Sequence, residues 1–259
     1  MNQPKLAVVT GASSGIGLEI AKLAAQDGFD LIVAADTPFV EAAPAFEEFD
    51  VGVDQIEADL SSQQGVQQLL DMIGDRQVDV LVANAGHGLG HGFLDQGPDE
   101  WQHVINTNIT GTLLLIQPIV QRMVERGEGK VLITGSIAGH IAGTFQAVYN
   151  GSKAFVDSFA AALNEEIKGS GVTITCLKPG ATDTNFFHRA EMEDTKVGQA
   201  KKDDPADVAK VGWKAMKSGE PAVIYGLKNK MQVAVSDVLP DAQTAKIHRK
   251  QAEPGSGLD

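Results

Sequence analysis

The sequence predicts an α/β fold, a doubly wound parallel sheet of about seven strands with helices on both of its faces. Short runs of β-branched and aliphatic residues alternate along the 259 residues with segments of helical periodicity, and this alternation is typical of βαβ units. The strand candidates 78–83 and 130–134 have continuous apolar centres, as do strands that helices cover on both sides. No repeat, low-complexity tract or Pro-rich linker divides the chain, so we expect one domain over residues 1–259.

The predicted elements follow one another in a regular order. Strands are expected at 5–10, 30–35, 51–58, 78–83, 130–134, 172–178 and 222–225. Helices are expected between them at 16–26, 63–74, 99–126, 147–168 and 205–218, with a weaker one at 38–49 that Pro44 interrupts. The polar, aperiodic stretch 183–203 predicts a mobile loop, 227–251 a helical C-terminal extension, and 253–259 a flexible tail.

Composition and charge exclude several classes of protein. The net charge of −13 would repel nucleic acid and anionic membrane surfaces. No stretch approaches the roughly 18 apolar residues of a membrane-spanning helix, and the N-terminus leaves no room for a signal peptide. The single cysteine, Cys176, lies in an apolar run and is best explained as a small buried hydrophobe. We therefore expect a cytoplasmic protein whose partner is a small molecule.

A glycine-rich turn joins the first predicted strand to the first predicted helix. It runs from Thr10 to Gly17 with the sequence TGASSGIG. Glycines permit a tight turn and the close approach of a pyrophosphate, and the free N–H groups at the start of the helix face that anion. Such a turn would also serve as a plain connection. An acid about 20 residues further on, Asp36, supplies the second feature that a dinucleotide site requires.

Asp36 at the end of the second strand bears on the choice of cofactor. Its carboxylate could accept hydrogen bonds from the adenosine ribose diol and repel a 2′-phosphate, although an aspartate here could also cap the next segment. Neither Ser14 nor Thr37 beside it is a base. NAD is therefore favoured over NADP, which stays possible.

The segment YNGSK contains a candidate base. Tyr149 and Lys153 are four apart at the start of a predicted helix and so share one face. A free tyrosine has a pKa of about 10, and a nearby ammonium would lower that pKa. Ser136 follows the strand 130–134, at the sheet edge where ligands bind in such folds. Taken alone, the spacing could be incidental and Ser136 a turn residue.

Together these motifs resemble the classical short-chain dehydrogenase/reductase family over roughly residues 5–225. The resemblance rests on the glycine turn, Asp59, Asn84-Ala85-Gly86, Asn108, Ser136, Tyr149-x3-Lys153 and Pro179-Gly180. It implies a single Rossmann-type domain in which Tyr149 is the general acid/base and Ser136 orients the reacting oxygen. It also implies that Lys153 binds the nicotinamide ribose and that Asn108 completes a proton relay through water.

The resemblance further implies a set of residues that line the cofactor cleft. They are Gly11, Ser13, Ser14, Gly15, Ile16, Gly17, Asp36, Asp59, Leu60, Asn84, Ala85, Gly86, Tyr149, Lys153, Pro179, Gly180, Thr182 and Thr184. Asp59 alone could be a helix cap, and Asn84 alone could satisfy backbone groups. The family also implies a homotetramer or homodimer joined through helices 99–126 and 147–168, whose apolar residues core packing would equally explain.

Four residues are candidates for contact with substrate: Ser136, His140, Phe186 and Phe187. The two phenylalanines lie in 183–203, which the resemblance makes a substrate lid, although packing against the body would use the same residues. His140 could equally be a solvated or packed histidine. His87 and His91 lie in a glycine-rich loop and are too few for a metal site, so no metal is expected.

These observations favour an oxidoreductase that transfers a hydride between NAD and a secondary alcohol or its ketone. An NADPH-dependent carbonyl or 3-oxoacyl reductase would use the same residues. A non-catalytic dinucleotide sensor or scaffold could keep the fold. The intact set of Ser136, Tyr149 and Lys153 argues against that last alternative, because a sensor has no need of a base.

Overall fold

The computed structural model describes residues 4–258 and contains one parallel sheet of seven strands. The strands are β1 (Leu6–Thr10), β2 (Asp30–Ala35), β3 (Val53–Glu57), β4 (Val80–Ala83), β5 (Gly129–Thr134), β6 (Val172–Lys178) and β7 (Ala222–Ile224). Their order is β3-β2-β1-β4-β5-β6-β7. The predicted doubly wound fold is thereby confirmed. The order reverses direction between β1 and β4, and ligands bind outside the carboxyl ends of strands at such a point.

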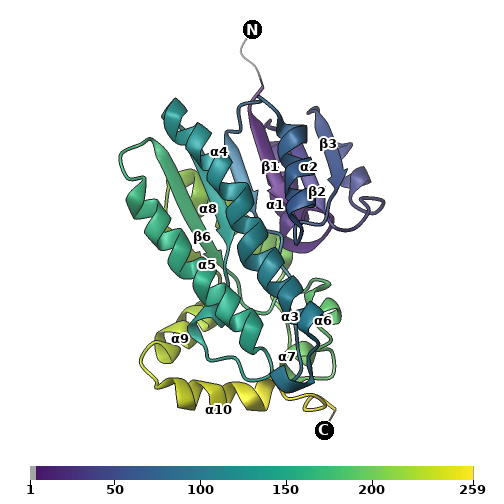
Figure 1. Ribbon diagram of the computed structural model, residues 1–259, viewed down its shortest axis with the longest axis vertical. Coiled ribbons are helices and arrows are strands. Elements are labelled where there is room, and N and C mark those ends of the chain that lie inside the picture. Colours follow the sequence, from purple (N-terminus) through teal and green to yellow (C-terminus); the bar gives the residue numbers. More distant parts are fainter. Residues whose placement is uncertain (1–3, 259) are drawn as a thin grey trace.

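Helices cover both faces of the sheet (Figure 1). The α-helices are α1 (Gly15–Gln26), α2 (Gln63–Ile73), α3 (Pro98–Ile105), α4 (Thr112–Arg126), α5 (Ala147–Glu166), α6 (Phe186–Arg189), α7 (Lys196–Gln199), α8 (Pro205–Ser218), α9 (Leu227–Ser236) and α10 (Asp241–Ala252). Shorter or wider turns are η1 (Ala43–Phe46), η2 (Phe93–Asp95), the π-helix η3 (Asn106–Gly111) and η4 (Ile137–His140). Within residues 4–258, none of these helices is both long and apolar enough to cross a membrane.

The core consists of two apolar layers, one on each face of the sheet. Alternate residues of β1 divide between them, so that Val8 packs with α2, α4 and α5 while Val9 packs with α1 and α8. Successive side chains of a strand point to opposite faces. A strand buried on both faces must therefore be apolar throughout, and this is the pattern from which the sheet was predicted.

Two of the predicted helices are each divided in the structure. The expected helix 99–126 is divided by the π-helix η3, where a Cβ on Gly111 would lie only 2.0 Å from the carbonyl oxygen of Leu60. The expected helix 227–251 is interrupted at Pro240, between α9 and α10, because proline lacks an N–H and disfavours helical backbone before it. The weak helix at 38–49 is reduced to the single turn η1.

The segments predicted as a mobile loop and a flexible tail are packed against each other. The loop 183–203 contains α6 and α7. The amide of Gly255 donates to the Asp194 carboxylate at 2.6 Å, and the amide of Lys196 donates to Ser256 Oγ at 3.1 Å. The end of the chain thus lies on the loop; Asp259, the last residue of the predicted tail, lies outside the described residues.

Candidate active site

The side chains of Ser136, Tyr149 and Lys153 meet at the carboxyl end of β5. Tyr149 and Lys153 lie one turn apart on the buried face of α5. Ser136 is also buried and begins η4, where its hydroxyl accepts a hydrogen bond from the Ala138 amide at 3.1 Å. The side chains of Ser136 and Tyr149 lie close enough for the serine hydroxyl to favour the ionised phenol. The structure therefore brings together three residues that span 17 positions of the sequence, from Ser136 to Lys153.

Burial changes the proton affinities of this pair. It raises the pKa of Tyr149 to about 12, a shift that the nearby Ser136 hydroxyl opposes and the charge of Asp157 increases. Burial also lowers the pKa of Lys153, whereas Asp157 raises it. The Lys153 ammonium donates to the Thr134 carbonyl at 2.8 Å. The net shift of the Tyr149 pKa is upward, opposite to the direction expected from a nearby ammonium, because burial of the phenol is the largest effect.

Asn108 lies buried inside the π-helix η3, and its side chain is fully engaged. The amide nitrogen donates to the His87 carbonyl and to Ser152 Oγ, both at 2.9 Å, and Oδ1 accepts from the His87 amide at 2.7 Å. A Cβ on Gly86 would lie 3.4 Å from both Asn108 Oδ1 and Lys153 Nζ. Asn108 and Lys153 therefore border the same small space beside Gly86.

The glycine turn between β1 and α1 has the backbone shape that a phosphate site requires. Gly11 and Gly15 have φ angles of 64° and 56°, a region that residues with a Cβ rarely adopt. A Cβ on Gly17 would lie 2.1 Å from the Gly11 carbonyl oxygen. Within the described chain, the side chain of Ser14 accepts no hydrogen bond from the first N–H groups of α1. The turn thus fits the pyrophosphate of a dinucleotide, which those N–H groups would bind.

Comparison with known proteins agrees with this geometry. A family model described as short chain dehydrogenase matches residues 5–195. This chain belongs to the short-chain dehydrogenase family. An uncharacterized oxidoreductase of Staphylococcus saprophyticus is 31% identical to this short-chain dehydrogenase over 241 residues, which are 91% of this chain and 96% of the relative.

Solved structures give the same result. A short-chain dehydrogenase from Sphingobium yanoikuyae in complex with NADPH has a TM-score of 0.80 at 26% identity, covering 91% of this chain and 96% of its own. A short-chain dehydrogenase/reductase from Burkholderia phymatum in complex with NAD has a TM-score of 0.81 at 21% identity, covering 97% and 98% of the two chains, and shares the fold. The protein is an enzyme, an oxidoreductase of CH–OH groups that uses a nicotinamide cofactor.

In this short-chain dehydrogenase, Asp36 is paired with a base that lies far away in the sequence. Arg189 of α6 contacts both carboxylate oxygens, with Nη1 3.3 Å from Oδ1 and Nη2 bonded to Oδ2. The sequence argument considered only the neighbours Ser14 and Thr37, so it missed this cation. His87 Nδ1 lies 3.5 Å from Arg189 Nη2, and burial lowers the pKa of His87 to about 4, assisted by the charge of Arg189. His87 is therefore neutral near pH 7.

The remaining cofactor candidates of the first half of the chain form the edge of the sheet. Asn84 Nδ2 donates to the Thr10 carbonyl at 3.0 Å, and its Oδ1 accepts from Thr134 Oγ1 at 3.0 Å, so this side chain ties β1 to β5. The amide of Ala85 donates to Thr10 Oγ1 at 3.0 Å. These contacts give Asn84 a structural function in addition to its predicted place in the cofactor cleft.

Asp59 and its neighbours form the turn that follows β3. Asp59 Oδ1 accepts from the Ser61 amide at 2.9 Å. Burial acts to raise the pKa of Asp59, but the hydrogen bonds from Ser61 outweigh it and the pKa is lowered. The next residue, Leu60, is buried in the core. In the glycine turn, Ser13 Oγ shares a 2.8 Å hydrogen bond with Thr37 Oγ1.

The segment after β6 closes over the glycine turn. The Pro179 carbonyl accepts from the Ile137 amide at 3.1 Å, which joins this segment to residues 136–140, that is Ser136 with η4, called the serine turn below. Thr182 Oγ1 donates to the Gly180 carbonyl at 3.1 Å. A Cβ on Gly15 would lie 2.7 Å from Thr184 Cγ2, so Thr184 packs directly against the turn.

The two phenylalanines of the predicted lid point to different places. Phe186 lies beside Tyr149, with ring centroids 5.1 Å apart, and packs so closely on the loop after β4 that a Cβ on Gly88 would lie 2.3 Å from its Cζ. Phe187 is buried in a separate apolar cluster that includes Ala252 of the C-terminal extension. The structure thus brings Phe186, and not Phe187, to the proposed reaction site.

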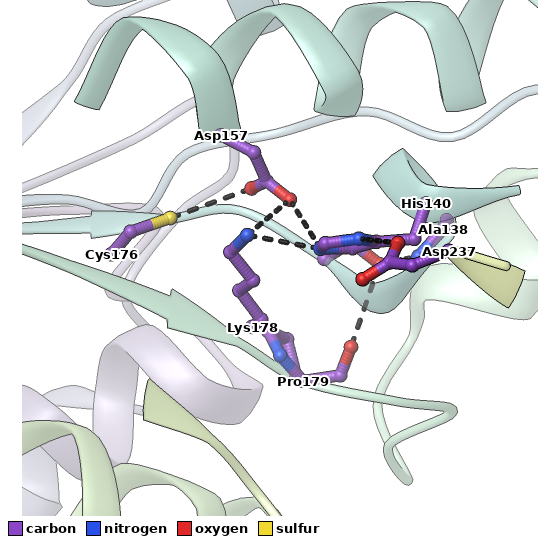
Figure 2. A network of polar contacts seen from close by, with 8 residues as sticks. Ala138, His140, Asp157, Cys176, Lys178, Pro179 and Asp237 are labelled. Carbon is purple, nitrogen blue, oxygen red and sulfur yellow. Dashed lines mark hydrogen bonds and ion pairs between the residues drawn. The ribbon is translucent and has the colours of Figure 1, made fainter. Parts of the chain in front are cut away.

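His140 belongs to a network of charged groups rather than to an apolar substrate wall (Figure 2). Its ring lies between Asp237, the residue after α9, and Lys178 at the end of β6. Nδ1 is 2.8 Å from Asp237 Oδ1, and Nε2 is 3.0 Å from Lys178 Nζ. Asp157 lies next to them. Sequence reasoning missed Asp157, although its position four residues after Lys153 signals the same helix face.

Proposed function

We propose that this enzyme transfers a hydride between NAD and a secondary alcohol or its ketone, with Tyr149 as the general acid/base. The observation that carries the proposal is that the buried side chains of Ser136, Tyr149 and Lys153 lie together at the carboxyl edge of the sheet, with Ser136 close enough to Tyr149 to affect its pKa. The nicotinamide, when bound, supplies the hydride for reduction or accepts it for oxidation.

The residues of the chain hold the substrate oxygen and move its proton. Ser136 would hold that oxygen by a hydrogen bond. Tyr149 Oη takes the hydroxyl proton in oxidation and gives it to the carbonyl oxygen in reduction. Because burial raises the pKa of Tyr149 to about 12, the phenol is protonated near pH 7. The site by itself is therefore in the state that reduction requires, and Lys153 would stabilise the phenolate that reduction leaves.

The surroundings of Tyr149 favour an apolar substrate. Its ring packs in a cluster with Leu89 and Val104, against which Trp101 and Phe186 also pack. Apolar walls exclude water and strengthen the polar interactions within the site. We therefore place the hydrophobic part of the alcohol or ketone between these residues.

The chain supplies binding groups along the whole length of a dinucleotide. The glycine turn would hold the pyrophosphate, Lys153 and Asn108 would border the nicotinamide ribose, and Asp36 would accept hydrogen bonds from the adenosine ribose. We place NAD first because of that carboxylate. The pairing of Arg189 with Asp36 favours a second candidate, an NADPH-dependent carbonyl reductase, since a guanidinium can bind a 2′-phosphate.

The test is a screen of secondary alcohols and ketones with both cofactors, followed by Tyr149→Phe. This variant should keep its affinity for NADH and lose about 10²- to 10⁴-fold in kcat, the usual contribution of a general acid or base. Tyr225→Phe changes the only other tyrosine and should keep full activity. Unchanged turnover in Tyr149→Phe would overturn the mechanism, and a wild-type protein that neither binds NADH nor turns over any substrate would overturn the function.

A further inference from the structure

The buried carboxylate of Asp157 lies next to the proposed reaction site. Asp157 is on α5, two turns after Tyr149 and one turn after Lys153, so all three share one face of the helix. It is only 9% exposed. Aspartate is rarely buried to this degree unless it is paired, and the proton transfer described above does not use it.

Two glycines beside Ser136 leave the room that this carboxylate occupies. A Cβ on Gly135 would lie 1.9 Å from Asp157 Oδ1, and a Cβ on Gly139 would lie 2.9 Å from Oδ2. The ammonium of Lys153 is bonded to the carbonyl of Thr134, the residue before Gly135. The carboxylate and the ammonium therefore contact consecutive residues at the end of β5.

The carboxylate is held from its other side by β6 (Figure 2). Lys178 Nζ lies 3.1 Å from Asp157 Oδ2, and Cys176 Sγ donates to Oδ1 at 3.4 Å. Among the described residues, Oδ2 has no aligned hydrogen-bond donor, so its attraction to Lys178 is that of opposite charges. An ammonium can only donate, so His140 Nε2 accepts a hydrogen bond from Lys178 Nζ. The other ring nitrogen, Nδ1, then donates to the Asp237 carboxylate.

Polar groups from each element packed against Asp157 face its carboxylate. They are Tyr149 and Lys153 of α5, His140 of η4, Cys176 and Lys178 of β6, and, through His140, Asp237 just after α9. Burial disfavours the charged form of Lys153, and the charge of Asp157 acts against that effect. A buried ammonium without such a partner readily loses its proton.

We propose that Asp157 is a positioning residue that keeps Lys153 in its charged form from behind the serine turn, and that Lys178, seated on His140, holds Asp157 in place. That a charged Lys153 matters for turnover rests on the proposed function. The electrostatic coupling between Asp157 and Lys153 is independent of that function and can be measured without turnover.

The deciding measurement is an NMR titration of Lys153 in the full-length protein carrying ¹³C-labelled lysine, with the signal assigned through Lys153→Arg. In Asp157→Asn, Lys153 should lose its proton about one pH unit or more below the wild type, the effect of removing a close opposite charge. Asp237→Asn removes an exposed carboxylate at the outer end of the same network and should leave the titration nearly unchanged. An unchanged Lys153 titration in folded Asp157→Asn would overturn the proposal.

A second variant allows the same measurement if Asp157→Asn does not fold. Asp157→Asn leaves the half-buried Lys178 without its partner, which is destabilising, whereas removing both charges is often tolerated. Asp157→Asn combined with Lys178→Gln should therefore fold and show the same downward shift of the Lys153 titration. In turnover, both variants should move the alkaline limb of the kcat/KM–pH profile to lower pH, whereas a purely structural effect would lower kcat without moving the limb. Absence of any wild-type turnover would overturn the proposed function, and the NMR titration would still decide this inference.

Discussion

At the residue scale, the ion pair of Asp36 with Arg189 lies where we propose that the adenosine ribose binds. Their side chains are 34% and 39% exposed, so the pair contributes little to stability. Its importance lies in recognition. The carboxylate can bind a ribose diol, and the guanidinium would be free for a 2′-phosphate if the carboxylate were absent.

Replacing Asp36 should therefore change the cofactor preference. In Asp36→Ser we expect the ratio of kcat/KM for NADPH to that for NADH to rise about tenfold or more, because the repulsion of the 2′-phosphate is lost and a tenfold change needs only about 1.4 kcal/mol. Steady-state kinetics with both cofactors checks this.

Two variants make that result interpretable. Adding Arg189→Ala to Asp36→Ser should cancel the gain with NADPH, since Arg189 is the cation that takes the phosphate. Asp54→Ser removes another exposed aspartate that is paired with an arginine, Arg76, and should leave the ratio as it is. If Asp36→Ser kept the wild-type ratio, Asp36 would not select the cofactor.

At the element scale, the connection of β1 to α1 depends on the absence of a side chain at Gly17. A Cβ there would lie 2.1 Å from the Gly11 carbonyl oxygen and 2.5 Å from Asn84 Nδ2. Both contacts are with groups that hold the end of the sheet together, so neither can move cheaply. In contrast, a Cβ on Gly151 of α5 meets nothing within 4 Å.

Gly17→Ala should therefore separate the effect of the turn from that of helix propensity. We expect it to destabilise the protein by about 1–3 kcal/mol, as overpacking does, and to weaken NADH binding, measured by denaturant unfolding and NADH fluorescence. Gly151→Ala should keep the NADH affinity and be neutral or stabilising by up to about 1 kcal/mol, since alanine is the better helix former. Equal effects of the two substitutions would contradict a special function of the turn.

At the scale of the whole molecule, α4 and α5 lie on the same face of the sheet (Figure 1). Both helices also carry apolar side chains that are partly exposed. Leu114, Val124 and Phe155 are 36%, 38% and 40% exposed. These are the helices through which the sequence predicts a homodimer or homotetramer. A second copy covering this surface would bury the three side chains.

Phe155→Glu should therefore reduce the mass of the particle in solution. We expect the wild type to be a dimer or tetramer by size-exclusion chromatography with light scattering, and the variant to dissociate, because a charge buried in an apolar interface is costly. Val40→Glu changes a more exposed apolar residue away from these helices, at 80% exposure, and should leave the mass unchanged. A monomeric wild type would contradict the predicted assembly.

The sequence by itself determined where the seven strands lie along the chain and that they form a parallel sheet. It also determined the glycine turn and the spacing of Tyr149 from Lys153. These features depend on local periodicity and on backbone requirements that a few consecutive residues satisfy. The proposed catalytic set could be named for the same reason, since each member stands at a strand end or on a helix face that the local pattern reveals.

Only the tertiary structure decided which distant segments meet. Arg189 reaches Asp36 across 153 positions, and Asp157 meets Lys178 and His140 because β6, η4 and α5 converge behind the serine turn. Burial of Tyr149, which raises its pKa to about 12, is likewise set by the segments packed around it. Ion pairing and desolvation act through space and are independent of separation along the chain, so no local pattern in the sequence could reveal them.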